Sequence, residues 1–344
     1  MSDLALYRKY RPGAFADVVG QDHVVDVLKG ALKQGATAHA YLFAGPRGTG
    51  KTSIARILAR ELGASPNDIY EIDAASNRGV DEIRELREAV RTLPFESPVK
   101  VYIIDEVHML TTPAFNALLK TLEEPPKHVV FILATTDLHK LPETIVSRCQ
   151  TFAFKRLNVA DLAKIATTIA KAEGYALEKD AAQLVALLGE GAVRDTIGIL
   201  QKVVGSAPAG EITRERVEMV TGAPKASLVH NYLQALLVKN TEAALKALQT
   251  AIDDTSDVAV FLKIALRETR TAMLMKFAPA MKDSFLEGLS KEEAMALEAL
   301  AGHQNALILP AILKELLAAH QAIGSYYLPQ IALELVAVKV GTQA

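Results

Sequence analysis

Cysteine and net charge are both scarce in this sequence, and each scarcity excludes a class of protein. A single cysteine, Cys149, cannot form an internal disulfide or supply a cluster of thiolate metal ligands, which fits a reducing cytosol. The formal net charge is only -2, so a uniformly basic coat for nucleic acid is excluded. A local basic patch is not excluded, because residues 1–60 hold nine Lys and Arg residues against four Asp.

Long hydrophobic runs are also missing. No stretch approaches the roughly 18 uninterrupted apolar residues of a membrane-spanning helix, and the start, Met-Ser-Asp-Leu, does not resemble a signal peptide. We therefore expect a cytoplasmic protein without membrane contact. Half of the residues are hydrophobic and 23% are charged, which excludes wholesale disorder.

Four short apolar runs in the first half of the chain predict a parallel α/β sheet. Segments with helical spacing, such as Ser53–Leu62 and Val80–Arg91, accompany these runs. A further helix is expected to start with the hydroxyl cap at Thr111 and to end before Pro125. The four predicted strands are Tyr41–Ala44, Ile69–Ile72, Val101–Ile104 and Val129–Ala134.

Strand signals stop after residue 157, and every later pattern is helical. We expect helices over 160–173, 179–188, 193–204 and 213–220, followed by a helical remainder. The sequence therefore predicts three domains, in keeping with its length. They are an α/β P-loop domain with a parallel sheet over 1–157, a small helical domain over 158–222 and an all-helical domain over 223–344.

A phosphate-binding motif follows the first predicted strand. The segment Gly45-Pro46-Arg47-Gly48-Thr49-Gly50-Lys51-Thr52 fits G-x-x-x-x-G-K-[ST] in full, and Ser53 opens the next helix. Its glycines let backbone N–H groups turn toward phosphates at the positive end of that helix. Lys51 would neutralise the β- and γ-phosphate oxygens, and the Thr52 hydroxyl would ligate Mg²⁺. The alternative, a glycine-rich turn without a ligand, is disfavoured by the strand before it and the helix after it.

An acidic pair, Asp105 and Glu106, follows the predicted strand Val101–Ile104. In a P-loop protein an acid at that strand end reaches the metal, usually through water, so Asp105 joins Thr52 as a predicted Mg²⁺ ligand. Glu106 is placed to act as the general base for the attacking water. Such a pair alone is often a helix cap, and the upstream P-loop favours the catalytic interpretation.

Three more polar positions are candidates for contact with the γ-phosphate. Thr136 follows the strand Val129–Ala134, Arg148 follows a helix signal, and Arg194 opens a later helix. An arginine serves a phosphate as a fixed, always-charged fork. Taken alone, each position is more often a strand-end hydroxyl or a surface salt bridge.

A set of segments across residues 4–157 forms a pattern far more specific than the P-loop alone. They are Tyr7–Pro12, Asp17–Gln21, Thr52–Arg56, Glu71–Gly79, Asp105–His108, Phe115–Pro125, Ala134–Thr136 and Ser147–Cys149. On these segments the chain resembles the bacterial clamp-loader ATPases, the gamma/tau subunits of DNA polymerase III in the AAA+ superfamily. The match is weaker through Gly191–Asp195, and residues 224–344 match only as a helical region of the right length.

The resemblance implies roles for individual residues, and it implies that ATP and Mg²⁺ are the cofactors. Thr136 is similar to the sensor 1 residue, Arg194 to the sensor 2 residue, and Arg148 to the arginine finger that acts on the ATP of the next subunit. The residues implied around the adenine are Arg8, Arg11, Pro12, Val18 and Val19.

The resemblance also implies partners and a location. Residues 158–222 would form a lid, and the C-terminal helices a collar that closes a five-membered ring with delta-type and delta-prime-type arms. The ring would use ATP to open the sliding clamp and load it on primer–template DNA. The chain is thus expected to be an ATPase of the DNA polymerase III holoenzyme in a cytoplasmic, nucleoid-associated replisome.

The sequence departs from the family in two respects. Relatives usually carry a four-cysteine zinc module after the P-loop helix, whereas Gly63–Asn67 here is short and has no cysteine, so no zinc site is expected. The tau-type extension that grips polymerase and helicase is also missing, so the resemblance does not extend to coupling with the polymerase core.

Two other functions compete with the clamp-loader ATPase. One is an AAA+ ATPase of recombination or repair, which shares the P-loop and sensors, although Ser147–Cys149 joined to Glu71–Gly79 speaks against it. The other is a structural clamp-loader arm, disfavoured by the intact Lys51, Thr52, Asp105 and Glu106. Arg78 is a candidate DNA-phosphate contact, or a loop arginine paired with Asp81 or Glu82.

Overall fold

The computed structural model describes residues 4–207, 210–286, 289 and 291–342. The chain forms two compact units. The first consists of the described residues up to Ile165 together with Gly189–Gly198. The second consists of Ala166–Leu188 together with the described residues from Ile199 onward. The boundaries fall within α7 (Val159–Ala172), at the end of α8 (Lys179–Leu188) and within α9 (Val193–Ser206). The three-domain division at 157 and 222 stays a prediction.

The first unit is built on a five-stranded parallel sheet with the order β2-β3-β4-β1-β5. The four predicted strands are confirmed, and a fifth, β5, escaped prediction. It has only four residues at the sheet edge, and only Phe152 among them is buried, so it lacks an apolar run. The strands are β1 (Ala40–Ala44), β2 (Ile69–Asp73), β3 (Lys100–Asp105), β4 (Val129–Thr135) and β5 (Gln150–Ala153).

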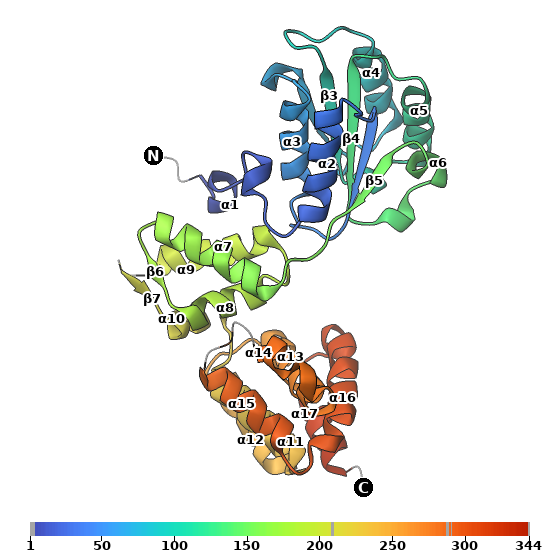
Figure 1. Cartoon of the computed structure of the whole chain (residues 1–344). Coiled ribbons are helices and arrows are strands. Elements are labelled where there is room, and N and C mark those ends of the chain that lie inside the picture. Colours follow the sequence, from blue (N-terminus) through green and yellow to red (C-terminus); the bar gives the residue numbers. More distant parts are fainter. Residues whose placement is uncertain (1–3, 208–209, 287–288, 290, 343–344) are drawn as a thin grey trace. The chain divides into compact units, whose positions relative to one another are not determined.

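Helices cover both faces of this sheet (Figure 1). On one face, α2 (Asp22–Gln34) and α3 (Lys51–Glu61) pack on side chains that include Val101 and Ile103 of β3. On the other face, α4 (Val80–Val90) and α5 (Thr112–Glu123) pack on Tyr102 and Ile104. Because both faces are buried, the central strands contain continuous apolar runs, such as Val101–Ile104 of β3, rather than alternating ones.

The predicted boundaries of α5 are confirmed. Thr111 is its N-cap residue and Pro113 lies in its first turn, although the Thr111 side chain makes no capping hydrogen bond. The helix ends at Glu123, before Pro125 and Pro126, whose rings cannot continue it. The smaller helices of this unit are α1 (Leu6–Lys9) and α6 (Glu143–Val146).

The second half of the chain is mainly helical, as predicted. The helices expected from 160 to 220 are α7 (Val159–Ala172), α8 (Lys179–Leu188), α9 (Val193–Ser206) and α10 (Arg214–Thr221). The expectation of no strand after residue 157 is wrong, because β6 (Ala176–Leu177) and β7 (Glu211–Ile212) form a parallel pair. Two-residue strands are too short to produce a periodic pattern.

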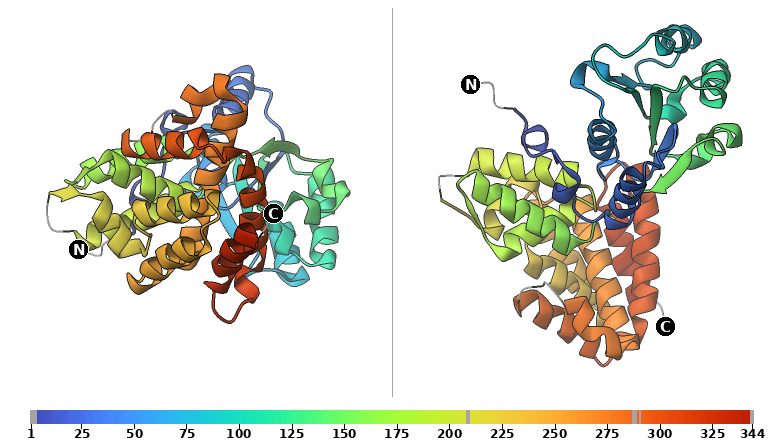
Figure 2. Two further views of the ribbon diagram at one scale, coloured as in Figure 1. Left: turned by 90° about the horizontal axis from the view of Figure 1, so that it is seen from below. Right: turned by 45° about the horizontal axis from the view of Figure 1, so that its top comes forward.

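The C-terminal helices form a bundle within the second unit, where the orange and red segments of Figure 2 lie side by side. Helix α13 packs on α15 and α16, and α16 packs on α17. The helices are α11 (Ala226–Leu237), α12 (Thr241–Asp253), α13 (Val258–Phe277), α14 (Lys282–Leu286), α15 (Lys291–Gly302), α16 (Leu309–Ala322) and α17 (Ile331–Thr342).

One helical segment of the bundle, Ala306–Ser325, is long and apolar enough to cross a membrane by length and composition alone. It contains α16, which packs between α13 and α17. Glu315 on this helix pairs with Lys339 of α17 at 3.3 Å. These contacts are those of a bundle helix in a folded unit.

Candidate nucleotide site

A cavity of about 220 Å³ lies in the first unit, where the P-loop leaves β1. It brings together most of the residues predicted for nucleotide binding: Arg11, Pro12, Val18, Val19, the P-loop residues 47–53, Asp105, Glu106 and Arg194. Gly45, Pro46, Arg8, Thr136 and Arg148 are not among its lining residues. The lining residues that sequence reasoning missed are Tyr7, Tyr10, Asp17, Ile54, Ile165, Val193 and Ile197. Tyr7 and Tyr10 belong to the Tyr7–Pro12 segment, which was the available signal.

Two glycines allow the P-loop to pack closely on neighbouring backbone. Gly45 has φ +152°, and a Cβ there would collide with the Phe154 carbonyl oxygen. Gly48 has φ +75°, and a Cβ there would lie 2.8 Å from the Cβ of Ala192. In addition, the Val193 N–H donates to the Gly48 carbonyl at 3.0 Å, so the start of α9 is bonded to the P-loop. Only glycine combines this backbone conformation with this closeness.

Lys51 is buried at the start of α3 and bonded to its own loop. Its Nζ donates to the carbonyl oxygens of Gly45 at 2.7 Å and Pro46 at 2.9 Å. Burial lowers the pKa of this ammonium group, and the nearby Glu106 and Asp105 oppose that shift. The ammonium is therefore held at the loop, where phosphate oxygens can replace the two carbonyls as acceptors.

The two predicted metal ligands are in direct contact. The Thr52 hydroxyl donates to Asp105 Oδ2 at 2.7 Å, joining the start of α3 to the end of β3. Hydroxyl and carboxylate oxygens are the donors that Mg²⁺ prefers. A nucleotide-bound Mg²⁺ ion takes most of its ligands from waters and phosphate oxygens and needs only one or two from the protein. The pair Thr52 and Asp105 fits that requirement. Across the residues that the structure describes, no group of three or more His, Cys, Asp and Glu could hold a metal by itself.

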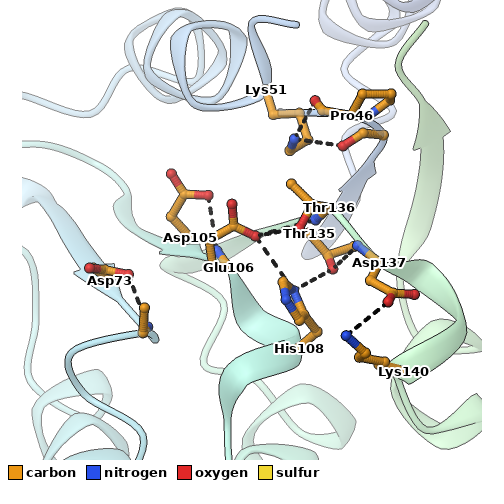
Figure 3. A network of polar contacts seen from close by, with 12 residues as sticks. Pro46, Lys51, Asp73, Asp105, Glu106, His108, Thr135, Thr136, Asp137 and Lys140 are labelled. Atoms are coloured by element: carbon orange, nitrogen blue, oxygen red, sulfur yellow. Dashed lines mark hydrogen bonds and ion pairs between the residues drawn. The ribbon is translucent and has the colours of Figure 1, made fainter. Parts of the chain in front are cut away.

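Glu106 and Thr136 lie together at the ends of β3 and β4 (Figure 3). Glu106 Oε2 accepts hydrogen bonds from the Thr136 hydroxyl at 3.0 Å and the Thr136 N–H at 3.3 Å. The Glu106 backbone has φ +48°, an uncommon conformation for a residue with a side chain. The predicted base and the predicted sensor 1 residue therefore touch, although Thr136 does not line the cavity itself.

His108 and Thr135 surround this pair and were not singled out from the sequence. His108 Nδ1 lies 3.0 Å from Thr135 Oγ1 and 3.5 Å from Glu106 Oε2. Thr135 Oγ1 also accepts from the Asp137 N–H at 3.0 Å. His108 and Thr135 thus restrict where the Glu106 carboxylate can lie. The available signals were the segments Asp105–His108 and Ala134–Thr136, which contain these two residues.

Arg148 does not line the cavity. One guanidinium nitrogen donates to Glu123 Oε1 at 2.5 Å, and the other donates to the Thr144 carbonyl at 2.7 Å. Its side chain is 33% exposed. The neighbouring Cys149 is half-buried, and burial raises the pKa of its thiol to about 12, which makes it an inert packing group.

The parallel sheet, the P-loop and the acidic pair define a P-loop nucleotide-binding domain of the AAA+ class. The family described as "DNA polymerase III, delta subunit" matches residues 20–75 and 63–158. The chain is 39% identical to DNA polymerase III subunit tau of Bacillus subtilis over 99% of this chain and 63% of that protein. It is 37% identical to DNA polymerase III subunit gamma of Buchnera aphidicola, over 80% of each chain. The chain belongs to the gamma/tau subunit family of DNA polymerase III.

Two further comparisons show how much of its relatives' length this chain spans and which solved structure shares its fold. The chain spans 63% of the length of the Bacillus subtilis relative and 42% of subunit tau of Escherichia coli, to which it is 42% identical. The solved structure of the Thermotoga maritima RuvB Holliday junction branch migration motor has a TM-score of 0.54 and 22% identity. It covers 66% of this chain and 79% of that one, and at this identity the likeness is one of fold.

A buried carboxylate, Asp68, stabilises the chain directly after the short segment Gly63–Asn67. Asp68 is fully buried and accepts hydrogen bonds from the N–H groups of Phe95, Glu96 and Ser97 and from the Ser97 hydroxyl. We predict that the purified protein contains no stoichiometric zinc, because its one cysteine cannot build a structural site. Elemental analysis after dialysis checks this, and one zinc per chain would contradict it.

Proposed function

We propose that this chain is the ATP-hydrolysing subunit of a clamp loader, which opens a sliding clamp and loads it on primed DNA. The observation that carries the proposal is the convergence of Lys51, the Thr52–Asp105 pair and Glu106 at one cavity. Membership of the gamma/tau family supports the replication role. The likeness to RuvB concerns the fold alone and does not favour a branch-migration motor.

Each group at the cavity has a chemical task in this proposal. Lys51 neutralises the β- and γ-phosphate oxygens, while Thr52 and Asp105 would hold Mg²⁺, which would offset the phosphate charge. Glu106 takes a proton from the attacking water. Thr136 orients the Glu106 carboxylate by its two hydrogen bonds. Arg194 contacts the γ-phosphate, and Arg148 acts on the ATP of the next subunit.

The proposed partners follow from the family. The collar helices join delta-type and delta-prime-type arms in a five-membered ring in the cytoplasm. The ring holds the clamp open while ATP is bound, and hydrolysis releases the closed clamp on the DNA.

The decisive experiment measures ATP hydrolysis by the chain with candidate arm subunits. We expect a low basal rate that rises when the sliding clamp and primed DNA are both added. Lys51→Ala, which removes the phosphate-binding ammonium, should abolish the activity and serves as the control. A rate that responds to neither clamp nor primed DNA would contradict the proposal.

The loop that carries Arg78 is bonded to both ends of the segment containing Glu106. The Ala74 N–H donates to the Asp105 carbonyl at 2.9 Å, and the Thr111 N–H donates to the Arg78 carbonyl at 3.1 Å. The Arg78 side chain is exposed, and among the described residues no carboxylate pairs with it. Asp81, one of its two candidate partners, pairs with Arg84 at 3.0 Å. This arrangement supports a role for Arg78 in signalling DNA occupancy to Glu106.

We predict that Arg78→Ala lowers the DNA-stimulated ATPase rate and leaves nucleotide affinity unchanged. The substitution removes one phosphate contact, so the salt dependence of DNA binding should become shallower by about one unit of slope. Arg91→Ala, which removes an exposed arginine from the other end of α4, is the matched control. Unchanged stimulation at matched salt would show that Arg78 is a loop arginine only.

A further inference from the structure

An aromatic ring lies against the arginine that opens α9. The Cζ atom of Arg194 is 4.8 Å from the centroid of the Tyr7 ring, within the range of an attractive cation–π contact. Tyr7 lies on the short helix α1, far from Arg194 in sequence, and both side chains line the nucleotide cavity.

Arg194 is in a crowded cationic environment. The pKa of the neighbouring Arg11 is lowered first by burial and then by Arg56, and Arg194 and Arg8 lower it further, while Glu71 opposes the shift. Among the residues that the structure describes, no carboxylate forms an ion pair with Arg194. Repulsion by Arg8 and Arg11 therefore favours a guanidinium that swings out to solvent, unless another group retains it.

The backbone of Arg194 is fixed while its side chain is exposed. The preceding residue, Val193, is bonded to the Gly48 carbonyl of the P-loop at 3.0 Å, so the start of α9 cannot drift from the phosphate site. Within the part of the chain that the structure describes, no carboxylate restrains the exposed guanidinium by a hydrogen bond. The backbone hydrogen bond of Val193 does not restrain the Arg194 side chain, whereas the contact with the Tyr7 ring does.

Contact with a ring face leaves the hydrogen-bonding capacity of arginine available. The ring attracts the cation through its negative face, and the Tyr7 hydroxyl is also hydrogen-bonded to Arg194. The guanidinium group has five N–H donors, so other donors remain for a phosphate. We propose that Tyr7 is a positioning residue that holds Arg194 at the cavity and leaves those remaining donors to the γ-phosphate. This inference rests on the proposed ATPase function and adds to it the residue that prepares Arg194 for recognising ATP rather than ADP.

The test compares affinities of the full chain for a slowly hydrolysed ATP analogue and for ADP by calorimetry. Tyr7→Leu should weaken binding of the ATP analogue by about two- to fivefold and leave ADP binding unchanged, because only the former carries the γ-phosphate. Tyr7→Phe keeps the ring face and removes only the hydroxyl, which is hydrogen-bonded to Arg194 and Arg8, so it should retain most of the preference for the ATP analogue that Tyr7→Leu loses. Arg194→Ala should show the larger loss, and adding Tyr7→Leu to it should cause no further loss.

A second readout reports the contact itself. The sequence has no tryptophan, so Tyr7→Trp introduces a single fluorophore beside Arg194. The ATP analogue should change its emission more than ADP does, and Arg194→Ala should remove that difference. If Tyr7 had a purely structural role, the emission of the tryptophan at this position would not depend on both the γ-phosphate and Arg194.

The failure of this inference is distinct from the failure of the proposed function. Equal losses for both nucleotides in Tyr7→Leu, tighter binding of the ATP analogue, or additive effects in the double variant would overturn the role of Tyr7. A wild-type chain that binds no ATP analogue, or one whose binding is insensitive to Lys51→Ala, would instead overturn the proposed function.

Discussion

Arg148→Ala should leave the ATP affinity of the isolated chain nearly unchanged and abolish ATP turnover by the assembled ring. In its own chain Arg148 does not line the nucleotide cavity, and its guanidinium is held by Glu123 and the Thr144 carbonyl. Loss of Arg148 therefore removes no contact with the chain's own ATP. An arginine finger supplied to a neighbour's ATP is worth roughly 10³–10⁵ in rate in other phosphoryl-transfer systems.

Mixed rings test whether the arginine acts on the neighbouring subunit. Arg148→Ala chains keep a working P-loop, and Lys51→Ala chains keep the arginine, so rings containing both should recover part of the activity. Arg84→Ala is the control, because Arg84 is also an exposed arginine paired with a carboxylate, Asp81. Loss of ATP binding in Arg148→Ala alone, or no recovery in verified mixed rings, would show that Arg148 does not act in trans.

Glu106→Gln should lower ATP hydrolysis by about 10²- to 10⁴-fold, the usual contribution of a general base, and preserve ATP binding. Glutamine has nearly the same shape, and its amide oxygen can still accept the hydrogen bonds from the Thr136 hydroxyl and N–H. It lacks the basicity to take a proton from water. The variant should therefore accumulate in the ATP-bound state.

Single-turnover hydrolysis and nucleotide affinity, measured on the same preparation, check this outcome. Glu85→Gln makes the same chemical change on the exposed surface of α4 and should behave like the wild type. Thr136→Val, which removes the hydroxyl bonded to Glu106, should lower the hydrolysis rate with little change in affinity. Hydrolysis by Glu106→Gln at the wild-type rate would exclude Glu106 as the base.

Local sequence patterns were sufficient for most of the fold. The apolar runs that became β1 to β4 are continuous because helices bury both sides of the sheet, and such runs are visible without a structure. The ends of α5 were equally visible, since Pro113 in its first turn and Pro125 after its end restrict the backbone next to them. The edge strand β5 and the two-residue pair β6 and β7 depend on a distant partner strand and left no periodic signal.

In the candidate site, too, some features were visible in the sequence and others depended on the tertiary structure. Sequence alone determined the P-loop and the acids after β3, because adjacent residues in one motif carry that chemistry. Only the tertiary structure decided the contacts between segments: Thr52 with Asp105, Glu106 with Thr136, Arg148 with Glu123, and Tyr7 with Arg194. The physical reason is that these residues are far apart in the sequence, and their separation along the chain does not indicate their distance in space. They are brought together by the strand order, by helix packing and by the hydrogen bond from Val193 to the P-loop.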